Sequence, residues 1–153
     1  MRITAKGIVN RDQEVTFLFD SKPYKGFVGD TVASALLAND VNLVGRSFKY
    51  HRPRGILGIG SEEPNALISV HKGGKIDPNV RATTQEIYEG LIVTSQNSWP
   101  SLKFDALAVN DILAPFFSAG FYYKTFMWPP RFWEALYEPI IRRAAGLGKL
   151  EYE

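Results

Sequence analysis

Short apolar segments separated by turn residues dominate the first hundred residues of the chain. Val15–Phe19 is rich in aromatic and β-branched residues and stops at the turn cluster Asp20–Pro23, after which Tyr24–Phe27 alternates again. This pattern predicts a β-hairpin. Two further apolar runs, Ala66–Val70 and Leu91–Val93, each predict another strand.

One amphipathic helix is predicted directly after the hairpin. Val32 and Leu36 belong to an apolar stripe at i, i+4 spacing, so we expect a helix from Val32 to about Asn39 that packs on the hairpin. Asp30 or Thr31 can cap its first turn. The order strand, strand, helix, loop, strand, strand is typical of a β-grasp domain, which is an α+β fold.

The composition changes after residue 100, so we predict a first domain over residues 1–100 and an aromatic-rich extension over residues 101–153. Eleven of the twenty aromatic residues lie between Phe104 and Tyr137. Their rings could bury on the order of 2,000 Å², which is the area of a standard protein interface. They could complete the core of the first domain, but we favour docking against another domain or subunit. The predicted docking residues are Phe116, Phe117, Phe121, Tyr122, Tyr123, Phe126, Trp128, Phe132 and Trp133.

A helix is predicted to close the chain, from about Pro130 to Ala145. Arg142 and Arg143 lie near its C-terminal end, where positive charge is favourable. Pro139 should kink or divide this helix, because proline lacks the backbone N–H of a helix interior.

Composition and charge exclude several classes of protein. A chain of 153 residues with 45% hydrophobic residues can bury its own core, and a formal net charge of +2 gives no reason to expect nucleic acid or an anionic membrane as partner. The sequence has neither an apolar run long enough to span a membrane nor a secretory leader, so we expect a cytoplasmic protein. With no cysteine, the chain cannot form disulfides or an all-cysteine iron–sulfur cluster.

The segment from Gly45 to Gly55 combines basic and aromatic residues and is the most unusual run in the chain. One hypothesis is an anion site for a flavin or dinucleotide phosphate, or for acidic groups of a partner, since arginine pairs bidentately with both. The alternatives are solvated or internally paired charges, and nucleic-acid binding, which the low net charge disfavours. The candidate residues are Arg46, Lys49, His51, Arg52 and Arg54.

Other patterns of reactive side chains predict neither a metal site nor catalysis. The only histidines, His51 and His71, have no metal-ligand spacing to each other or to a carboxylate. Glu62–Glu63 and Glu86–Glu89 are the carboxylate pairs that could offer an acid and a base, and we expect the second pair to be solvated on adjacent helical turns. The chain alone is therefore predicted to be non-catalytic.

Four long runs carry a resemblance to a known family. They are YKGFVGDTVASALLAND, GRSFKYHRPRGILGIGSEEPNALISV, TSQNSWPSLKFD and FSAGFYYKTFMWPPRFWEALYEPIIRRAAGLG. Together they resemble the N-terminal region of the α subunit of heterotetrameric sarcosine oxidase. The resemblance implies a [2Fe–2S] ferredoxin-like β-grasp domain, followed in the family by a dinucleotide-binding domain. The sequence ends before such a fingerprint, so we expect a fragment or a split gene.

The resemblance also implies the chemistry of the full assembly. That assembly oxidises sarcosine to glycine, passes the methylene group to tetrahydrofolate and electrons through flavin (FAD or FMN) to O₂, and holds NAD. None of these ligands is expected to bind residues of this chain. The implied partners are the remainder of the α subunit and the other oxidase subunits.

The cluster ligands of related flavoenzymes are missing from this sequence. Those relatives carry a C-x4-C-x2-C pattern after a similar Pro-Arg-Gly and a later fourth cysteine, and an ungapped overlay places these positions at Gly58, Glu63, Ala66 and Thr83. One carboxylate and one hydroxyl cannot replace four thiolates. We therefore expect the fold to persist without an iron–sulfur cluster.

These observations favour a non-catalytic structural domain of a sarcosine oxidase α subunit. One alternative is an independent protein-interaction module that uses its aromatic residues against an unrelated protein. Another is the same domain in a related amine or proline oxidase complex.

Overall fold

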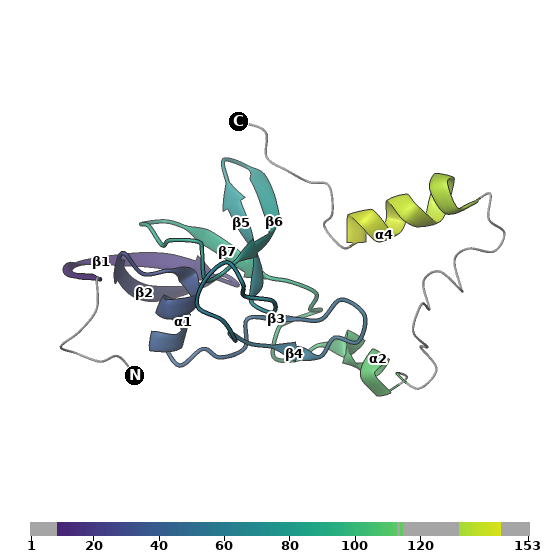
Figure 1. Ribbon diagram of the computed structural model, residues 1–153, viewed down its shortest axis with the longest axis horizontal. Coiled ribbons are helices and arrows are strands. Elements are labelled where there is room, and N and C mark those ends of the chain that lie inside the picture. The colour runs from purple at the N-terminus through teal and green to yellow at the C-terminus, as the bar shows by residue number, and fades with distance from the viewer. Residues whose placement is uncertain (1–8, 113, 115–131, 145–153) are drawn as a thin grey trace.

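The computed structural model describes residues 9–112, 114 and 132–144, and five of its strands form one sheet (Figure 1). The central strands β1 (Asn10–Phe19) and β7 (Ile92–Ser95) pair in parallel, with Leu18 opposite Ile92, whereas the other neighbours in this sheet are antiparallel. Two hairpins around a parallel central pair, with one helix packed on them, make a β-grasp fold, so the predicted α+β ferredoxin-like class is confirmed. In sheet order the strands are β2 (Lys22–Val28), β1 (Asn10–Phe19), β7 (Ile92–Ser95), β5 (Leu67–Lys72) and β6 (Lys75–Arg81).

Helix α1 (Val32–Ala38) lies where the apolar stripe predicted it. Thr31 is the N-cap and forms a capping box with Ser34, while Asn39 is the C-cap. The helix packs closely on β2 at Gly26, where an added Cβ would lie 2.4 Å from Ile87 Cδ1 and 3.1 Å from the Cβ of α1 residue Ala35. A side chain at this crossing would force Ile87 to move and would crowd Ala35.

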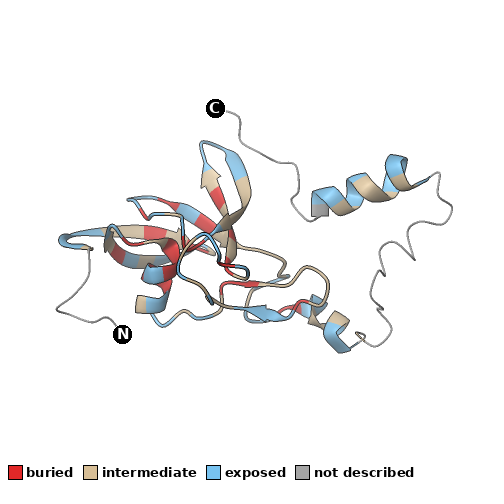
Figure 2. Ribbon diagram, viewed as in Figure 1, coloured by how far each residue is buried: buried red, intermediate tan, exposed pale blue. Residues whose placement is uncertain are grey.

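The hydrophobic core lies between α1 and the sheet, where Figure 2 shows the buried residues gathered. Leu36 of α1 meets Phe17, Ile68 and Val93 of the sheet in one cluster, and none of the four exposes any surface. Each such side chain contributes about 1.5–3 kcal/mol by leaving water. This packing provides the frame on which the surrounding loops are held.

Two features of the sheet differ from the sequence prediction. Strand β6 was not predicted, because its sequence KIDPNVR is polar and contains Pro78; it lies at the sheet edge, where proline is tolerated. A separate two-stranded ladder joins β3 (Gly45–Arg46) to β4 (Pro53–Arg54) within the basic segment.

Short helices follow the sheet. They are η1 (Ala106–Ala108), α2 (Val109–Ile112), the π-helical η4 (Trp133–Tyr137) and α4 (Glu138–Ala144). The predicted C-terminal helix is thus confirmed within the described residues, and its geometry changes from π to α beside Pro139, where we predicted a division. No helix among the described residues is long and apolar enough to cross a membrane.

Candidate functional site

The loop between β4 and β5 folds around the carboxylate of Glu63, of which only 1% is exposed. Glu63 Oε2 accepts the backbone N–H of Leu57 at 2.8 Å and that of Gly58. Glu63 Oε1 accepts the backbone N–H of Asn65 at 2.8 Å and that of Ala66 at 3.1 Å. Four backbone donors from one loop therefore hold a single buried carboxylate.

Three of the four predicted ligand positions meet at this carboxylate, and the fourth contacts the same loop. Gly58 and Ala66 each donate an N–H to Glu63. Thr83 lies on a separate segment, but its hydroxyl donates to the carbonyl of Gly60 at 2.7 Å and so ties that segment to the loop. The assignment of these residues as former cluster ligands stays a prediction, and the geometry is compatible with it.

The loop keeps Glu63 ionised. Burial alone would raise the pKa of Glu63, but the hydrogen bonds from the backbone of Gly58, Asn65, Ala66 and Leu57 outweigh this effect and lower it. A carboxylate that accepts four hydrogen bonds has no proton to donate and no free lone pair aimed at a substrate. The site is therefore built as an internal anion site of the fold.

The side chains at the four positions do not fit a [2Fe–2S] cluster. Gly58 and Ala66 offer no donor atom, the oxygens of Glu63 are already used, and no thiolate exists anywhere in the sequence. Within residues 9–112, 114 and 132–144, no group of three or more His, Cys, Asp or Glu side chains could hold a metal ion.

A second buried carboxylate, Asp105, organises the predicted basic cluster. His51 Nδ1 lies 2.8 Å from Asp105 Oδ2, and Arg46 Nε lies 3.5 Å from the same oxygen. Asp105 Oδ1 accepts the backbone N–H of Trp99 and of Leu107. Burial would raise the pKa of Asp105, but the Trp99 N–H, the His51 ring and the Leu107 N–H lower it. Arg46 and His51 therefore serve an internal network.

The other three basic residues do not join that network. Arg52 pairs with Asp111 at 2.6 Å on the surface, Lys49 lies over the ring of Tyr50, and Arg54 donates to the side chain of Asn65 at 2.6 Å. The five predicted basic residues thus divide between one buried ion network and surface contacts, in which Lys49 and Arg52 share the ring of Tyr50. Anion or partner binding by this segment stays a prediction.

Two of the nine predicted docking residues lie within the described structure. Phe132 is exposed and Trp133 is half-buried, at the start of the C-terminal helix. The rest, Phe116, Phe117, Phe121, Tyr122, Tyr123, Phe126 and Trp128, lie outside the described residues. Docking through this segment stays a prediction.

The sequence interpretation was wrong for one pair of carboxylates and missed a third carboxylate. Glu86 and Glu89 do not lie on helical turns: Glu86 forms an isolated bridge with Thr31, and Glu89 lies in a turn and accepts the Thr16 N–H at 2.7 Å. Asp105 was not singled out, although it follows a Trp-Pro pair after the last strand. A lone acidic residue in an otherwise apolar and aromatic run was the available signal.

Comparison with known proteins supports the resemblance read from the sequence. The chain is 63% identical over 152 residues to sarcosine oxidase subunit alpha of Rhizobium meliloti (strain 1021), which covers 99% of this chain and 15% of that protein. It is 45% identical over 94 residues to sarcosine oxidase subunit alpha of Corynebacterium sp. (strain U-96), covering 60% of this chain and 10% of that protein. The chain therefore spans about a tenth to a seventh of the length of these relatives.

A solved structure and a family model complete the comparison. The crystal structure of L-proline dehydrogenase from P.horikoshii matches 59% of this chain and 17% of its own, with 23% identity and a TM-score of 0.47, too low to carry an argument. The family model described as 2Fe-2S iron-sulfur cluster binding domain matches residues 12–98, more than half of the chain. On that match the chain belongs to the family of 2Fe-2S iron-sulfur cluster binding domains, of which it is a member without cysteine.

Proposed function

We propose that this chain is a non-catalytic structural domain of a sarcosine oxidase α subunit, in which a carboxylate has taken over the place of an iron–sulfur cluster. The observation that carries the proposal is Glu63, buried and bound by four backbone N–H groups at the centre of the predicted cluster loop. An iron–sulfur cluster with its thiolate ligands would also place negative charge among the backbone N–H groups of such a loop. The loop thus keeps its shape without a metal.

The proposed role follows from what such a domain can and cannot do. Without thiolates it cannot relay electrons, so its contribution to an oxidoreductase assembly is to fold, to hold its loops rigid and to present surfaces to neighbours. Its partners in this proposal are the remainder of the α subunit and the other oxidase subunits, in the cytoplasm. Flavin, NAD and tetrahydrofolate would bind elsewhere in that assembly.

A chimera tests this role directly. The matching 152-residue segment of the Rhizobium meliloti subunit would be replaced by this chain and coexpressed with its partner subunits. We expect an assembled complex that consumes oxygen with sarcosine at a rate close to the parental one, because a scaffold needs only to fold and dock. The same chimera with Glu63→Ala should lose assembly, whereas Glu62→Ala should keep it.

Two results would count against the proposal. An assembled chimera with normal flavin content but no sarcosine oxidation would show that this segment takes part in the reaction itself. Incubation of the purified chain with iron and sulfide tests the other half: a stable, coloured and reducible centre would contradict the absence of a cluster. Proline offered in place of sarcosine tests the related oxidase as an alternative.

A further inference from the structure

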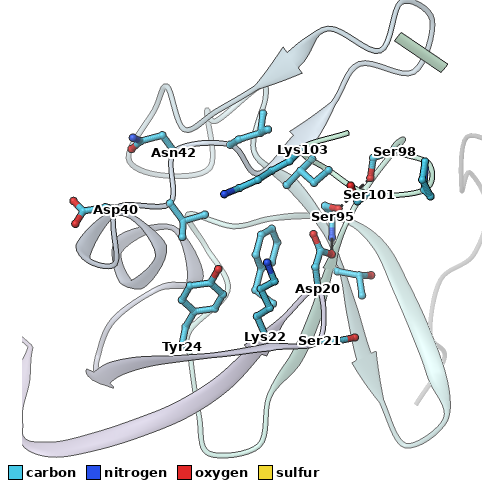
Figure 3. Close-up of a pocket in the computed structure, with 16 residues that line it drawn as sticks. Asp20, Ser21, Lys22, Tyr24, Asp40, Asn42, Ser95, Ser98, Ser101 and Lys103 are labelled. Carbon is cyan, nitrogen blue, oxygen red and sulfur yellow. Dashed lines mark hydrogen bonds between the residues drawn. The ribbon is translucent and has the colours of Figure 1, made fainter. Parts of the chain in front are cut away.

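A pocket of about 720 Å³ shares no lining residue with the Glu63 loop, residues 57–66. It is bounded by the β1–β2 turn, by residues 40–43 after α1, and by residues 94–103 after β7 (Figure 3). Its volume falls within the ~300–1,000 Å³ typical of small-molecule sites. Three segments distant in sequence thus enclose one space large enough for a ligand.

One wall of the pocket is apolar and anchored in the core. Phe19 is 3% exposed, and Tyr24, Val41 and Leu102 pack against the same buried cluster. The rings of Phe19 and Tyr24 lie with centroids 6.4 Å apart and planes tilted by 58°. Such a wall is already formed before any ligand arrives and suits an aromatic or aliphatic body.

The polar groups of the pocket are dominated by two lysines. Figure 3 shows the side chains of Lys22 and Lys103 directed into the space beside the Tyr24 hydroxyl. Within the described part of the chain, neither ammonium group lies in ion-pair distance of a carboxylate. Each could therefore bind an anion without first breaking an ion pair.

Two carboxylates also line the pocket, and what leaves the lysines available is the direction of these groups rather than the net charge. Asp20 Oδ1 already accepts the backbone N–H of Ser95 at 2.7 Å, and the carboxylate of Asp40 is turned away from the space in Figure 3. Hydroxyl groups of Ser98 and Ser101 also line the pocket. The space therefore combines an apolar wall, two cations directed inward, hydroxyl groups, and two carboxylates of which one is bound to the Ser95 N–H and the other is turned away (Figure 3).

We propose that this pocket binds a small organic anion, a carboxylate or phosphate carried on an apolar, aromatic body. The body would lie against Phe19 and Tyr24, and its anionic group would bind between Lys22 and Lys103. This site does not rest on the proposed scaffold role, since it uses none of the residues around Glu63.

The test is a binding titration of the full 153-residue chain, labelled with ¹⁵N, followed by amide chemical shifts. Three probes test the two halves of the proposed ligand separately. 2-Naphthoate carries both the apolar ring and the anionic group, the neutral 2-naphthamide carries only the ring, and inorganic phosphate carries only the anionic charge. We expect 2-naphthoate to shift amides of residues 20–24, 40–43 and 94–103, and to bind more tightly than either of the others, because only it satisfies both halves of the site.

Variants test the role of the cations. Changing Lys22 and Lys103 together to methionine should lower the affinity for 2-naphthoate by about tenfold. The affinity for 2-naphthamide should not change, since the apolar wall is kept. Lys72→Met is the matched control: it removes an exposed lysine at the end of β5, outside the pocket. Spectra of the variants also report whether they remain folded, and Lys103→Gln alone is the milder second variant.

Two outcomes would overturn the proposal. Equal affinity for 2-naphthoate and 2-naphthamide would show that no anion is recognised. Absence of binding, or shifts confined to residues outside the three bounding segments, would show that the pocket is not a binding site for this class of ligand. Neither outcome bears on assembly of the chimera.

Discussion

The two buried carboxylates of the chain hold different kinds of structure. The carboxylate of Glu63 accepts only backbone N–H groups of residues 57–66, all within one loop, while Arg81 Nε of β6 donates to the Glu63 carbonyl at 3.2 Å. Asp105 is bound by His51 and Arg46, more than fifty residues earlier in the chain, as well as by two nearby N–H groups. One carboxylate shapes a loop, and the other joins distant segments.

This difference indicates separate structural roles. The Glu63 carboxylate closes its loop from within, and neighbouring segments add bonds from Arg54, Arg81 and Thr83. The Asp105 network instead fastens residues 99–107 to the basic segment, so the contact between the two predicted parts of the chain extends past residue 100. Removing each carboxylate should therefore have distinct consequences.

The largest effect is expected from Glu63→Ala. The substitution leaves four backbone N–H groups without their acceptor in a buried site, and we expect a loss of about 3–5 kcal/mol in the free energy of unfolding, measured by urea denaturation. Glu62→Ala is the matched control: Glu62 accepts the N–H groups of Ile59 and Gly60, but these bonds are exposed and water can replace the carboxylate, so the loss should be less than about 1 kcal/mol. Similar losses from both variants would contradict the special role of Glu63.

The same variant allows a chemical rescue. Sodium formate supplies a small carboxylate that fits the space left by the Glu63 side chain, and it should restore part of the lost stability of Glu63→Ala. Sodium chloride at the same ionic strength should not. Equal stabilisation by both salts would show that the N–H groups do not recognise a carboxylate.

A smaller effect is expected from Asp105→Asn, since asparagine keeps an oxygen for the backbone donors but places an uncharged NH2 donor where Oδ2 faces His51 and Arg46. We expect about 1.5–3 kcal/mol of destabilisation, the range for hydrogen bonds to charged groups. Hydrogen exchange should increase at residues 99–107 and leave the Glu63 loop protected. Asp111→Asn, in the exposed pair with Arg52, is the control and should change little.

Acidification should affect both carboxylates in the same direction. Their pKa values are lowered in the folded state, from 4.5 for Glu63 and 3.8 for Asp105, so the stability they contribute is present above those values and is lost as pH falls through the folded-state pKa. Urea unfolding should thus show a steep loss of stability in the wild type below pH 4.5. Glu63→Gln should flatten that dependence, and an unchanged slope would contradict the cause given for the lowered pKa.

Local patterns made much of the fold predictable. The alternation of Val15–Phe19 and the apolar stripe of α1 reflect which side chains face the core, and the Thr31 cap is a contact over three residues. Strand β6 could not be recognised in this way, because an exposed edge strand needs no apolar alternation and can contain Pro78. Local sequence reports on burial, and an edge strand buries little.

The site was less predictable for a related reason. The absence of cysteine was enough to predict that no iron–sulfur cluster binds. The burial of Glu63, in contrast, depends on how a glycine-rich loop turns its backbone N–H groups inward, and the pattern of side chains does not indicate this. The His51–Asp105 contact spans 54 residues and exists only once the sheet has formed. Contacts of this kind belong to tertiary structure.

The smallest effect is expected where a separate segment touches the Glu63 loop. Thr83→Val keeps the shape of a buried side chain but removes the hydroxyl that donates to Gly60, and should cost about 1 kcal/mol in the free energy of unfolding. Thr84→Val is the matched control, because Thr84 is exposed and its hydroxyl bonds only the nearby Arg81 carbonyl. Since the loop is closed by its own carboxylate, hydrogen exchange at Leu57 and Ala66 should stay slow in Thr83→Val. Rapid exchange there would show that the loop depends on its neighbour after all, and would remove the distinction between the two carboxylates.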